Sequence, residues 1–411
     1  MSLFDDASLV TTPNGYKASK LYSIKPTSGA GDMVVSRGTT ARRVDSSGII
    51  ESMAINVPRL DYPPLGGCPR ILIEPERINR VFRSEEFSNA YWLKYSATAD
   101  ANTTTAPDGT TTADLVYPLT TNQLTGQVYK QLTTGITSGD VVTVSVFVKA
   151  SGKNFAYISP VFNFSPGAWF NLTTGEITYP TTPWANVTAS RTAFANDWWR
   201  ISLTSISTSS SNNVTIGSTD VANNNLNTAS GFDGILLWGA QIEVGSTATS
   251  YIPTTTAIAT RNADVINATG VSSLIGATEG TIFIEANLTA NTDQRRIITL
   301  GTEFERIMFW TSGTTLRANF NSVTVIIGTF PIGTAKMALG YTIAGGSTTY
   351  SIKLNNDTLI TGTAAAAPSS LSVINLGNSA NGTLILNDRI ESATLFLTRL
   401  TDQQLADLTA I

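Results

Sequence analysis

The sequence contains no histidine and a single cysteine, Cys68. Histidine is the commonest general base near neutral pH, so its absence excludes hydrolases that depend on a Ser–His or Cys–His pair. A lone cysteine cannot form a disulfide within one chain, and without a histidine to activate it we expect no nucleophilic role. The stability of the fold must therefore come from core packing or from oligomerisation.

Charge and long apolar runs are also scarce. Charged residues make up 14% of the chain, against roughly a quarter in an average soluble domain. No run of like charges or basic–aromatic interleaving is present, which argues against nucleic-acid binding. No apolar run approaches the roughly 18 residues of a membrane span, and the first residues lack the features of a signal peptide. We expect a protein made in the cytoplasm, without membrane insertion.

The polar residues that are present are mostly Thr, Ser, Asn and Gly. Thr tolerates strand geometry, while Asn and Gly supply tight turns, so this composition is typical of β-rich extracellular or virion surfaces. The length of 411 residues suggests two or three domains. No Gly-rich phosphate-binding motif occurs, and no cofactor is predicted.

Residues 1–80 have little periodicity and many Pro and Gly breakers. Such a segment is predicted to be an extended N-terminal arm that orders against a partner or against neighbouring copies of itself. Because closed symmetry is the common solution for such contacts, a homotrimer is favoured. A chain lacking residues 1–60 is expected to fold still.

Residues 81–265 show the pattern of an all-β domain. In Val141–Ala150 the residues Val142, Val144, Val146 and Val148 alternate with polar or larger side chains, so that one face is expected in the core and the other outward. Further strands are predicted at 155–159, 168–172, 198–204 and 234–244. Short strands between turn signals indicate a sandwich or jelly roll.

Residues 266–411 are predicted to form a second all-β unit that begins near Gly280. Near the end of the sequence a short helix is predicted to begin, with Thr401 as N-cap and Gln404 as its capping-box partner. Leu400, Leu405 and Leu408 are expected to let this helix close one edge of the sandwich.

Several blocks of the sequence resemble a segment common in structural proteins of tailed bacteriophages. They lie in order between residues 37 and 265 and include RGTTARRVDSSGIIESMAINVPRLDY, RILIEPERINRVFRSEEFSNAYW and LWGAQIEVGSTATSYIPTTTAIATRNADV. The resemblance implies a virion protein of the head-fibre or tail-fibre type. Its middle domain looks like a carbohydrate-binding-module jelly roll, and its last part looks like a laminin-G or concanavalin-like sandwich. The predicted fold class is all-β, an extended arm followed by two antiparallel β-sandwich domains.

Indole side chains are the best candidates for glycan contact, because sugar rings stack their apolar faces on them. The middle domain holds several, and Trp169, Trp184 and Trp198 are predicted to bind glycan. Adjacent strand residues face opposite ways, so one indole of the Trp198–Trp199 pair is expected in the core.

Acidic pairs are the best candidates for catalysis. Glu303 and Glu305 are expected to share one strand face, as glycosidases require of two carboxylates. Similar sandwich hydrolases carry an E-x-D-x-x-E run, and here the later acid is missing, so no catalytic residue is predicted. Glu74 and Glu76 have the same spacing, with Arg77 and Arg80 as expected ion-pair partners. Loop oxygens could come from Asp357 and from 381–388, but no metal site is predicted.

The sequence therefore predicts a non-enzymatic structural protein of a phage particle. The arm would attach it to other virion proteins, and the two sandwiches would project toward bacterial surface polysaccharide. One alternative is a virion-associated glycan-degrading enzyme, which the missing histidine and the incomplete acidic run disfavour. Another is a bacterial surface lectin or adhesin, which the absent signal peptide disfavours.

Overall fold

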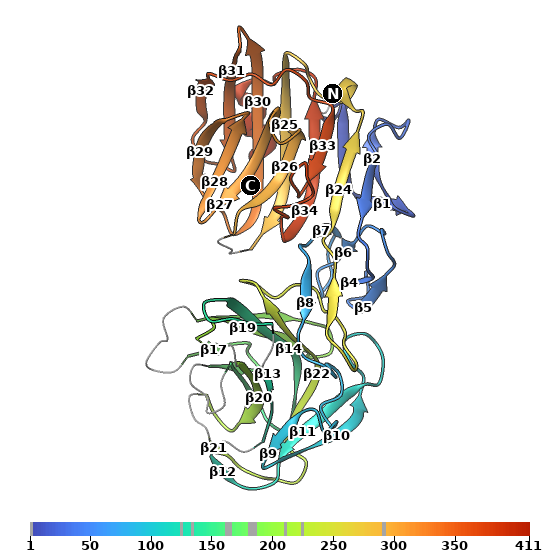
Figure 1. Cartoon of the computed structure of the whole chain (residues 1–411), viewed down its shortest axis with the longest axis vertical. Coiled ribbons are helices and arrows are strands. Elements are labelled where there is room, and N and C mark those ends of the chain that lie inside the picture. Colours follow the sequence, from blue (N-terminus) through green and yellow to red (C-terminus); the bar gives the residue numbers. More distant parts are fainter. Residues whose placement is uncertain are drawn as a thin grey trace.

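The computed structural model describes residues 3–123, 126–132, 135–160, 167–179, 187–208, 212–222, 226–289 and 293–411. Within these ranges nearly all regular structure is antiparallel β-strand, and the one α-helix is α1 (Asp402–Thr409). Two β-sandwiches lie one above the other, with both termini on the upper one (Figure 1). The predicted all-β class is confirmed. No helix in the described part of the chain is long and apolar enough to cross a lipid bilayer.

The lower sandwich is a jelly roll of two six-stranded sheets. The first sheet runs in the order β10 (Ala97–Thr104), β11 (Ala113–Pro118), β22 (Gly234–Val244), β14 (Val141–Ser151), β19 (Trp199–Ile206) and β18 (Thr188–Ala193). The second runs in the order β17 (Ile177–Thr178), β16 (Ala168–Asn171), β15 (Phe155–Ser159), β20 (Asn212–Thr219), β13 (Gln127–Leu132) and β9 (Leu93–Tyr95). The short strands β12 (Asn122–Gln123) and β21 (Leu226–Asn227) pair beside them.

Strand β14 lies near the middle of the first sheet and is buried on both faces. Its valines at 142, 144, 146 and 148 enter the core between the two sheets, as the alternation predicts. The opposite face was expected to look outward, but Thr143, Ser145 and Phe147 are at most 1% exposed. Phe147 packs there in a second cluster with residues of the N-terminal segment, so this face was predicted wrongly.

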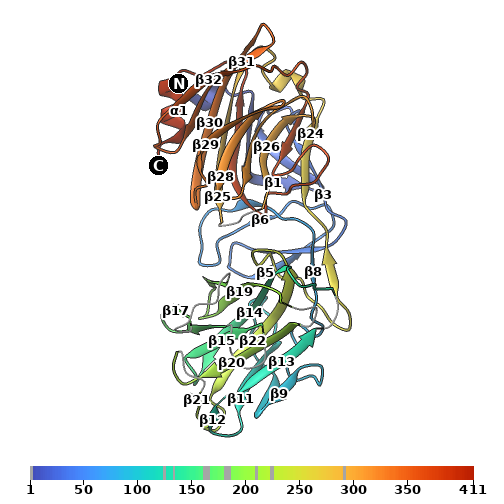
Figure 2. The ribbon, with the colours of Figure 1, turned by 60° about the vertical axis from the view of Figure 1, so that its left-hand side comes forward.

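The upper sandwich is one large sheet that folds back on itself. Among the described residues it has sixteen strands, fourteen of them in one continuous order. That order is β29 (Val323–Thr329), β28 (Thr315–Phe320), β27 (Arg306–Ser312), β26 (Arg295–Gly301), β33 (Val373–Leu376), β24 (Val265–Thr269), β3 (Met33–Ser36), β2 (Lys20–Lys25), β1 (Leu9–Lys17), β34 (Asp388–Phe396), β25 (Glu279–Leu288), β30 (Gly333–Ala344), β31 (Ser347–Leu354) and β32 (Ile360–Ala364). Its two ends face each other across one core, as Figure 2 shows from the side.

The first 80 residues are not an extended arm. Strand β1 pairs with β34 and β3 pairs with β24, and β7 (Arg70–Ile73) joins β34 beside β6 (Leu60–Asp61). Leu9, Leu21 and Met33 are fully buried in the core of the upper sandwich. The segment makes no core alone, as predicted, but the prediction that another protein or another copy orders it is wrong for these strands, because parts of the same chain more than 200 residues away pair with them.

This pairing also changes the domain boundaries. The upper sandwich combines residues 9–73 with residues 265–411, and the jelly roll is inserted between them. The two connections lie side by side in Figure 1, where β8 (Arg77–Asn79) pairs antiparallel with β23 (Ala259–Arg261). The predicted limits at 80 and 265 thus mark where the chain crosses between sandwiches. The hairpin of β4 (Ala41–Val44) and β5 (Ile50–Met53) lies beside this crossing.

Helix α1 begins as the sequence predicts. The Thr401 side chain accepts from the Gln404 amide, and the Gln404 side chain accepts from the Thr401 amide. Leu405 and Leu408 pack with Phe283 and Ala338. The helix therefore covers the outer face of β30 and β31, beside Phe283 of β25, and does not close an edge of the sandwich.

Replacing Leu21 by Ala should destabilise the upper sandwich by about 2–5 kcal/mol, the usual cost of a buried Leu-to-Ala cavity. Leu21 is 0% exposed on β2, whereas Ile24 on the same strand is 44% exposed. Ile24→Ala is the matched control and should cost far less. Urea unfolding followed by tryptophan fluorescence measures both. Equal, small effects would show that the N-terminal strands do not belong to this core.

Candidate functional site: the cleft between the sandwiches

A buried ion network holds the two sandwiches together where the chain crosses between them. We call Arg37, Arg59, Glu74, Arg261 and Asp264 the junction network; no side chain in it is more than 6% exposed. Arg37 pairs with Asp264 at 2.9 Å, and Arg261 pairs with Glu74 at 3.0 Å. Arg59 lies between the carboxylates and contacts both. Three guanidiniums therefore neutralise two carboxylates, and every charge has a partner.

Glu74 is the member that reaches into the jelly roll. It accepts hydrogen bonds from the Ser250 amide at 2.7 Å and the Ser250 hydroxyl at 2.6 Å. Burial alone would raise the pKa of Glu74, but Arg261, Arg59 and Ser250 hold it well below its ordinary value. The predicted partners Arg77 and Arg80 are not the ones that it uses. A carboxylate bound in this way cannot serve as a general acid near neutral pH.

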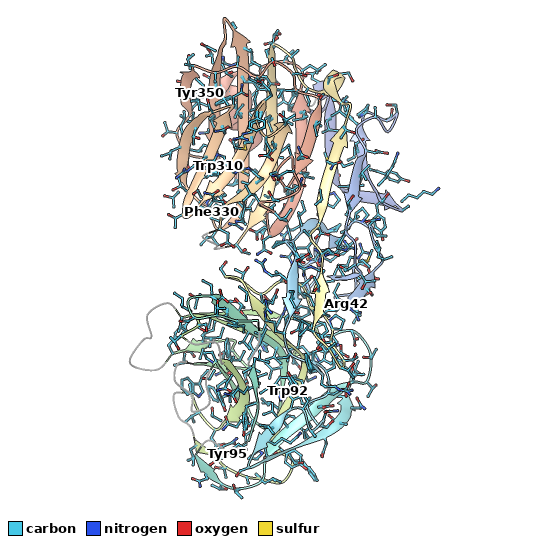
Figure 3. The ribbon with its side chains drawn as sticks, in the orientation of Figure 1. Arg42, Trp92, Tyr95, Trp310, Phe330 and Tyr350 are labelled. Carbon is cyan, nitrogen blue, oxygen red and sulfur yellow. The ribbon has the colours of Figure 1, made fainter. Side chains whose placement is uncertain are left out.

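Beside this network lies a cleft of about 530 Å³, which we call the junction cleft. Its floor is the outer face of β14, β19 and β18 of the jelly roll, and its roof is the start of β34. One wall comes from residues 42–44 and 61–64 of the N-terminal segment, and Arg42 is labelled at this level in Figure 3. The cleft thus needs both sandwiches and the N-terminal segment to exist.

The floor of the cleft is a regular grid of mainly polar side chains. The register of β18 and β19 aligns the lining side chains in three pairs, which are Arg200–Thr192, Ser202–Ser190 and Thr204–Thr188. The β14 residues Phe147, Ser145 and Thr143 continue these rows but are at most 1% exposed. Hydroxyls pair across the strands at 2.7 Å, between Ser190 and Ser202 and between Thr143 and Thr204. Because hydroxyls both donate and accept, such a surface can match the hydroxyls of a sugar.

Arg200 is the one cation in this grid. Its Nη2 donates to the Ser145 hydroxyl at 3.1 Å, and its guanidinium lies 5.3 Å from the centre of the Phe147 ring. Burial lowers the pKa of Arg200, and the charges of Glu243 and Glu74 offset this only in part. Its Nε has no hydrogen-bond partner. Arg200 is partly exposed and lines the cleft, so the exposed part of its guanidinium can contact a ligand there.

Direct polar contacts join the roof to the loop after β22 and to the N-terminal wall. Asn387 donates to the Thr247 hydroxyl at 2.9 Å, and Arg389 pairs with Asp61 at 2.7 Å. Burial raises the pKa of Asp388 to about 6, against the opposing effects of Arg295 and Thr289. The roof is therefore held at both ends, and the width of the cleft is set by these contacts.

The predicted tryptophans do not form a stacking surface. Trp169 is 4% exposed and packs beside Tyr157, and Trp198 is 2% exposed with its indole N–H donating to the Thr105 carbonyl at 3.2 Å. Both predictions of glycan contact are wrong, because these indoles fill apolar gaps between sheet and loop. Trp184 lies outside the described residues.

Of the Trp198–Trp199 pair, the partly exposed residue is Trp199, not Trp198. The Trp199 indole N–H donates to the Leu172 carbonyl at 2.9 Å, and Arg191 lies over its ring. Trp238 is fully buried. The alternation of side chains along a strand predicted that one of Trp198 and Trp199 would be buried and the other exposed, but it did not indicate which.

The acidic pairs have structural partners. Glu303 and Glu305 lie in the bend before β27 rather than on a strand. Glu303 pairs with Arg306 at 3.4 Å, and Glu305 accepts from the Ser369 amide at 2.6 Å. Across the described ranges, no group of three or more His, Cys, Asp or Glu side chains could hold a metal ion.

The sequence signals for the junction cleft were weak. Arg200 and Ser202 lie in the strand predicted at 198–204, but nothing in their spacing marked them as a site. The register that brings Ser145, Ser190 and Ser202 into one row joins strands that are far apart in the sequence. The polar face of β19 was the only local hint.

Replacing Glu74 by Gln should break the junction network, at a cost of about 3–5 kcal/mol at pH 7. Because the folded-state pKa of Glu74 is depressed, its contribution is present above about pH 4.5 and is lost as pH falls below that value. The difference between the two proteins should therefore narrow by about 1.4 kcal/mol per pH unit below pH 4.5. Urea unfolding at pH 7, 4.5 and 3.5 measures this difference.

Glu76→Gln is the control for that series, since Glu76 is exposed two residues away. It should leave stability within about 0.5 kcal/mol at each pH. A constant gap between wild type and Glu74→Gln across the series would contradict the depressed pKa.

Comparisons with known proteins find likeness in architecture. No protein-family model matches the sequence, and no curated protein matches it. The chain is similar to the carbohydrate-binding module CBM40 of Ruminococcus gnavus IT-sialidase bound to alpha2,3 sialyllactose, at 14% identity over 33% of this chain and 84% of that one, with a TM-score of 0.28.

Two further solved structures are similar to a comparable degree. Domain 4 of AbnA, a GH43 extracellular arabinanase from Geobacillus stearothermophilus, in complex with arabinotriose, is 14% identical over 40% of this chain and 82% of that one, with a TM-score of 0.29. Domains LG4-5 of the mouse laminin alpha1 chain are 10% identical over 68% of this chain and 87% of that one, with a TM-score of 0.20. Likenesses of this extent assign the chain to no family.

Proposed function

We propose that this protein is a non-enzymatic structural subunit of a tailed-phage particle, and that its junction cleft binds a glycan of the bacterial surface. The observation that carries the binding proposal is the grid of hydroxyls and one guanidinium on the floor of a 530 Å³ cleft. A concave site with a few converging polar groups is the usual form of a small-ligand site.

The composition of the cleft favours a sugar over an apolar ligand. Hydroxyls of Ser190, Ser202 and Thr204 line the floor, and Tyr62 and Pro63 of the wall supply partly exposed apolar surface beside them. Sugars carry both hydroxyls and apolar C–H faces, so one ligand can satisfy both kinds of surface. The contacts of Asn387 with Thr247 and of Arg389 with Asp61 hold this geometry in place before a ligand arrives, which lowers the entropy cost of binding.

The virion role rests on the resemblance of residues 37–265 to phage structural proteins. The proposal of a non-enzymatic role rests on the lack of histidine and on the structural use of Glu74, Glu303 and Glu305. A virion-associated glycan-degrading enzyme and a bacterial surface lectin stay as alternatives, and the assays below separate them.

Replacing Arg200 by Gln should weaken binding of bacterial surface polysaccharide at least about tenfold, because the floor of the cleft loses the guanidinium that lies between its hydroxyls. Arg80→Gln is the matched control, since Arg80 is also a partly buried guanidinium whose Nε has no partner, but it does not line the cleft. Binding to immobilised polysaccharide measures both. Equal affinities of the two variants would remove the cleft from the proposal.

The same incubation also tests the enzyme alternative. Bound polysaccharide should keep its chain length with time, as measured by size-exclusion chromatography. Depolymerisation that disappears in Glu303→Gln/Glu305→Gln would establish a glycan-degrading enzyme instead.

Attachment through residues 1–80 and a homotrimer remain part of the proposal, but truncation cannot test them. Residues 9–36 contain the strands β1, β2 and β3 of the upper sandwich, so removing them would disturb folding as well as any attachment. Surface variants avoid this problem: Ile55 and Leu65 are 53% and 69% exposed on the N-terminal segment. Phe232, 69% exposed on the jelly roll, is a matched control.

Ile55→Glu/Leu65→Glu should fold and be absent from purified particles, because a buried interface does not accept unpaired charge. The Phe232→Glu variant should be incorporated into particles. Imaging of particles that carry the labelled chain measures incorporation of both variants. Sedimentation of the unmodified chain should give a trimer at micromolar concentration. Normal incorporation of the double variant into particles would contradict attachment through the N-terminal segment. A monomer in sedimentation would contradict the homotrimer.

A further inference from the structure

The outer face of the upper sandwich carries a short row of basic and aromatic side chains. Arg296 on β26 lies directly opposite Trp310 on β27, and Trp310 lies directly opposite Arg317 on β28. We call these three residues the basic row. Their neighbours Phe309 and Leu316 point into the core, so the row points away from it. Trp310 is labelled on this half of the sandwich in Figure 3.

The three side chains are stacked, and one buried N–H donor of each has no protein partner. The guanidinium carbons of Arg296 and Arg317 lie 4.9 Å and 5.1 Å from the centre of the Trp310 ring. This cation–π contact fixes the guanidinium planes without consuming any N–H group. Nη1 of Arg296, Nε1 of Trp310 and Nε of Arg317 all lack a hydrogen-bond partner. Buried donors are normally satisfied, so three unpaired ones in a single row require an explanation.

Within the described ranges no carboxylate forms an ion pair with Arg296 or Arg317, although the charge of Glu303 acts to raise the pKa of Arg296. The nearby carboxylate of Glu303 is engaged by Arg306 at 3.4 Å. Burial lowers the pKa of Arg296, and the charge of Arg306 lowers it further. Elsewhere in the described chain, buried guanidiniums such as Arg59 and Arg295 each face a carboxylate. The basic row is therefore a local positive site on a chain of net charge −4.

We propose that the basic row is a second binding surface, separate from the junction cleft, and that it binds an acidic saccharide chain. Guanidiniums recognise carboxylate and phosphate groups through paired N–H donors, and stacking has already restricted the two arginines. Trp310 and Arg317 are partly exposed, so a ligand can contact their exposed atoms, while the unpaired donors lie just beneath the surface. Adjacent strands are about 4.8 Å apart, so the row spans about 10 Å and matches successive groups along a chain.

A sparse polyanion fits this surface better than a nucleic acid. Duplex DNA carries one charge per about 1.7 Å, and binding it requires many cations along the contact. The row offers two, and the net negative charge of the chain repels a dense polyanion. An acidic polysaccharide has wider charge spacing and can use Trp310 for apolar contact.

The test compares two charge-matched double variants in binding to immobilised polyuronate, with neutral dextran and duplex DNA as other probes. Arg296→Gln/Arg317→Gln should weaken polyuronate binding at least about tenfold. Lys17→Gln/Lys20→Gln removes the same net charge from exposed sites on β1 and β2 and should leave affinity unchanged. Because Arg296 is only 8% exposed, the single variant Arg317→Gln serves as a second test, with an unchanged unfolding midpoint as the folding check.

Further measurements distinguish binding at the basic row from binding in the junction cleft. The Arg200→Gln variant should bind polyuronate with the same affinity as the unmodified chain, even though the substitution weakens binding of the glycan in the junction cleft. Affinity should fall as salt rises from 50 to 300 mM, since the contact is between charges. Equal binding by both double variants, equal binding of dextran, or tighter binding of DNA than of polyuronate would each overturn the proposal.

Discussion

The arrangement of this protein depends on one buried set of charges, the ion pairs of Arg59 with Glu74 and Asp264. These residues lie where the chain leaves the upper sandwich for the jelly roll and where it returns. A buried charge without a partner costs several kcal/mol, so neither connection can shift without exposing or isolating a charge. Glu74 also binds Ser250 of the segment that borders the jelly roll. The network therefore sets both the path of the chain and the position of one wall of the junction cleft.

The inserted topology has consequences for folding and for rigidity. The upper sandwich needs β1 from one end of the chain and β34 from the other, which pair at Val10 and Thr394. Such long-range pairing requires closure of a large loop, so we expect slow folding of this half compared with a local hairpin. Two connections between domains restrict relative motion more than one does. The junction cleft can therefore keep its shape without a ligand.

Because this chain has few charged residues, some of its described guanidiniums have no carboxylate beside them and are available to a ligand. The floor of the cleft is mainly Ser and Thr, and Arg200 is its one guanidinium. On the upper sandwich, Arg296 and Arg317 flank Trp310 without a carboxylate in contact within the described residues. In a chain rich in surface ion pairs, such groups would be neutralised by neighbours. Here they remain available to a ligand.

Features that depend on a few consecutive residues could be predicted from the sequence. The valine alternation of β14 placed four side chains in the core, and the Thr401–Gln404 capping box placed the start of α1. Both follow from backbone geometry alone, since a strand repeats every two residues and a cap is satisfied within one turn. Tertiary contacts decided the rest: Trp198 is buried because a loop covers it, and Leu21 is core because β34 and β24 complete its sheet. Burial of a side chain is a property of what packs against it, and here those partners come from distant parts of the chain.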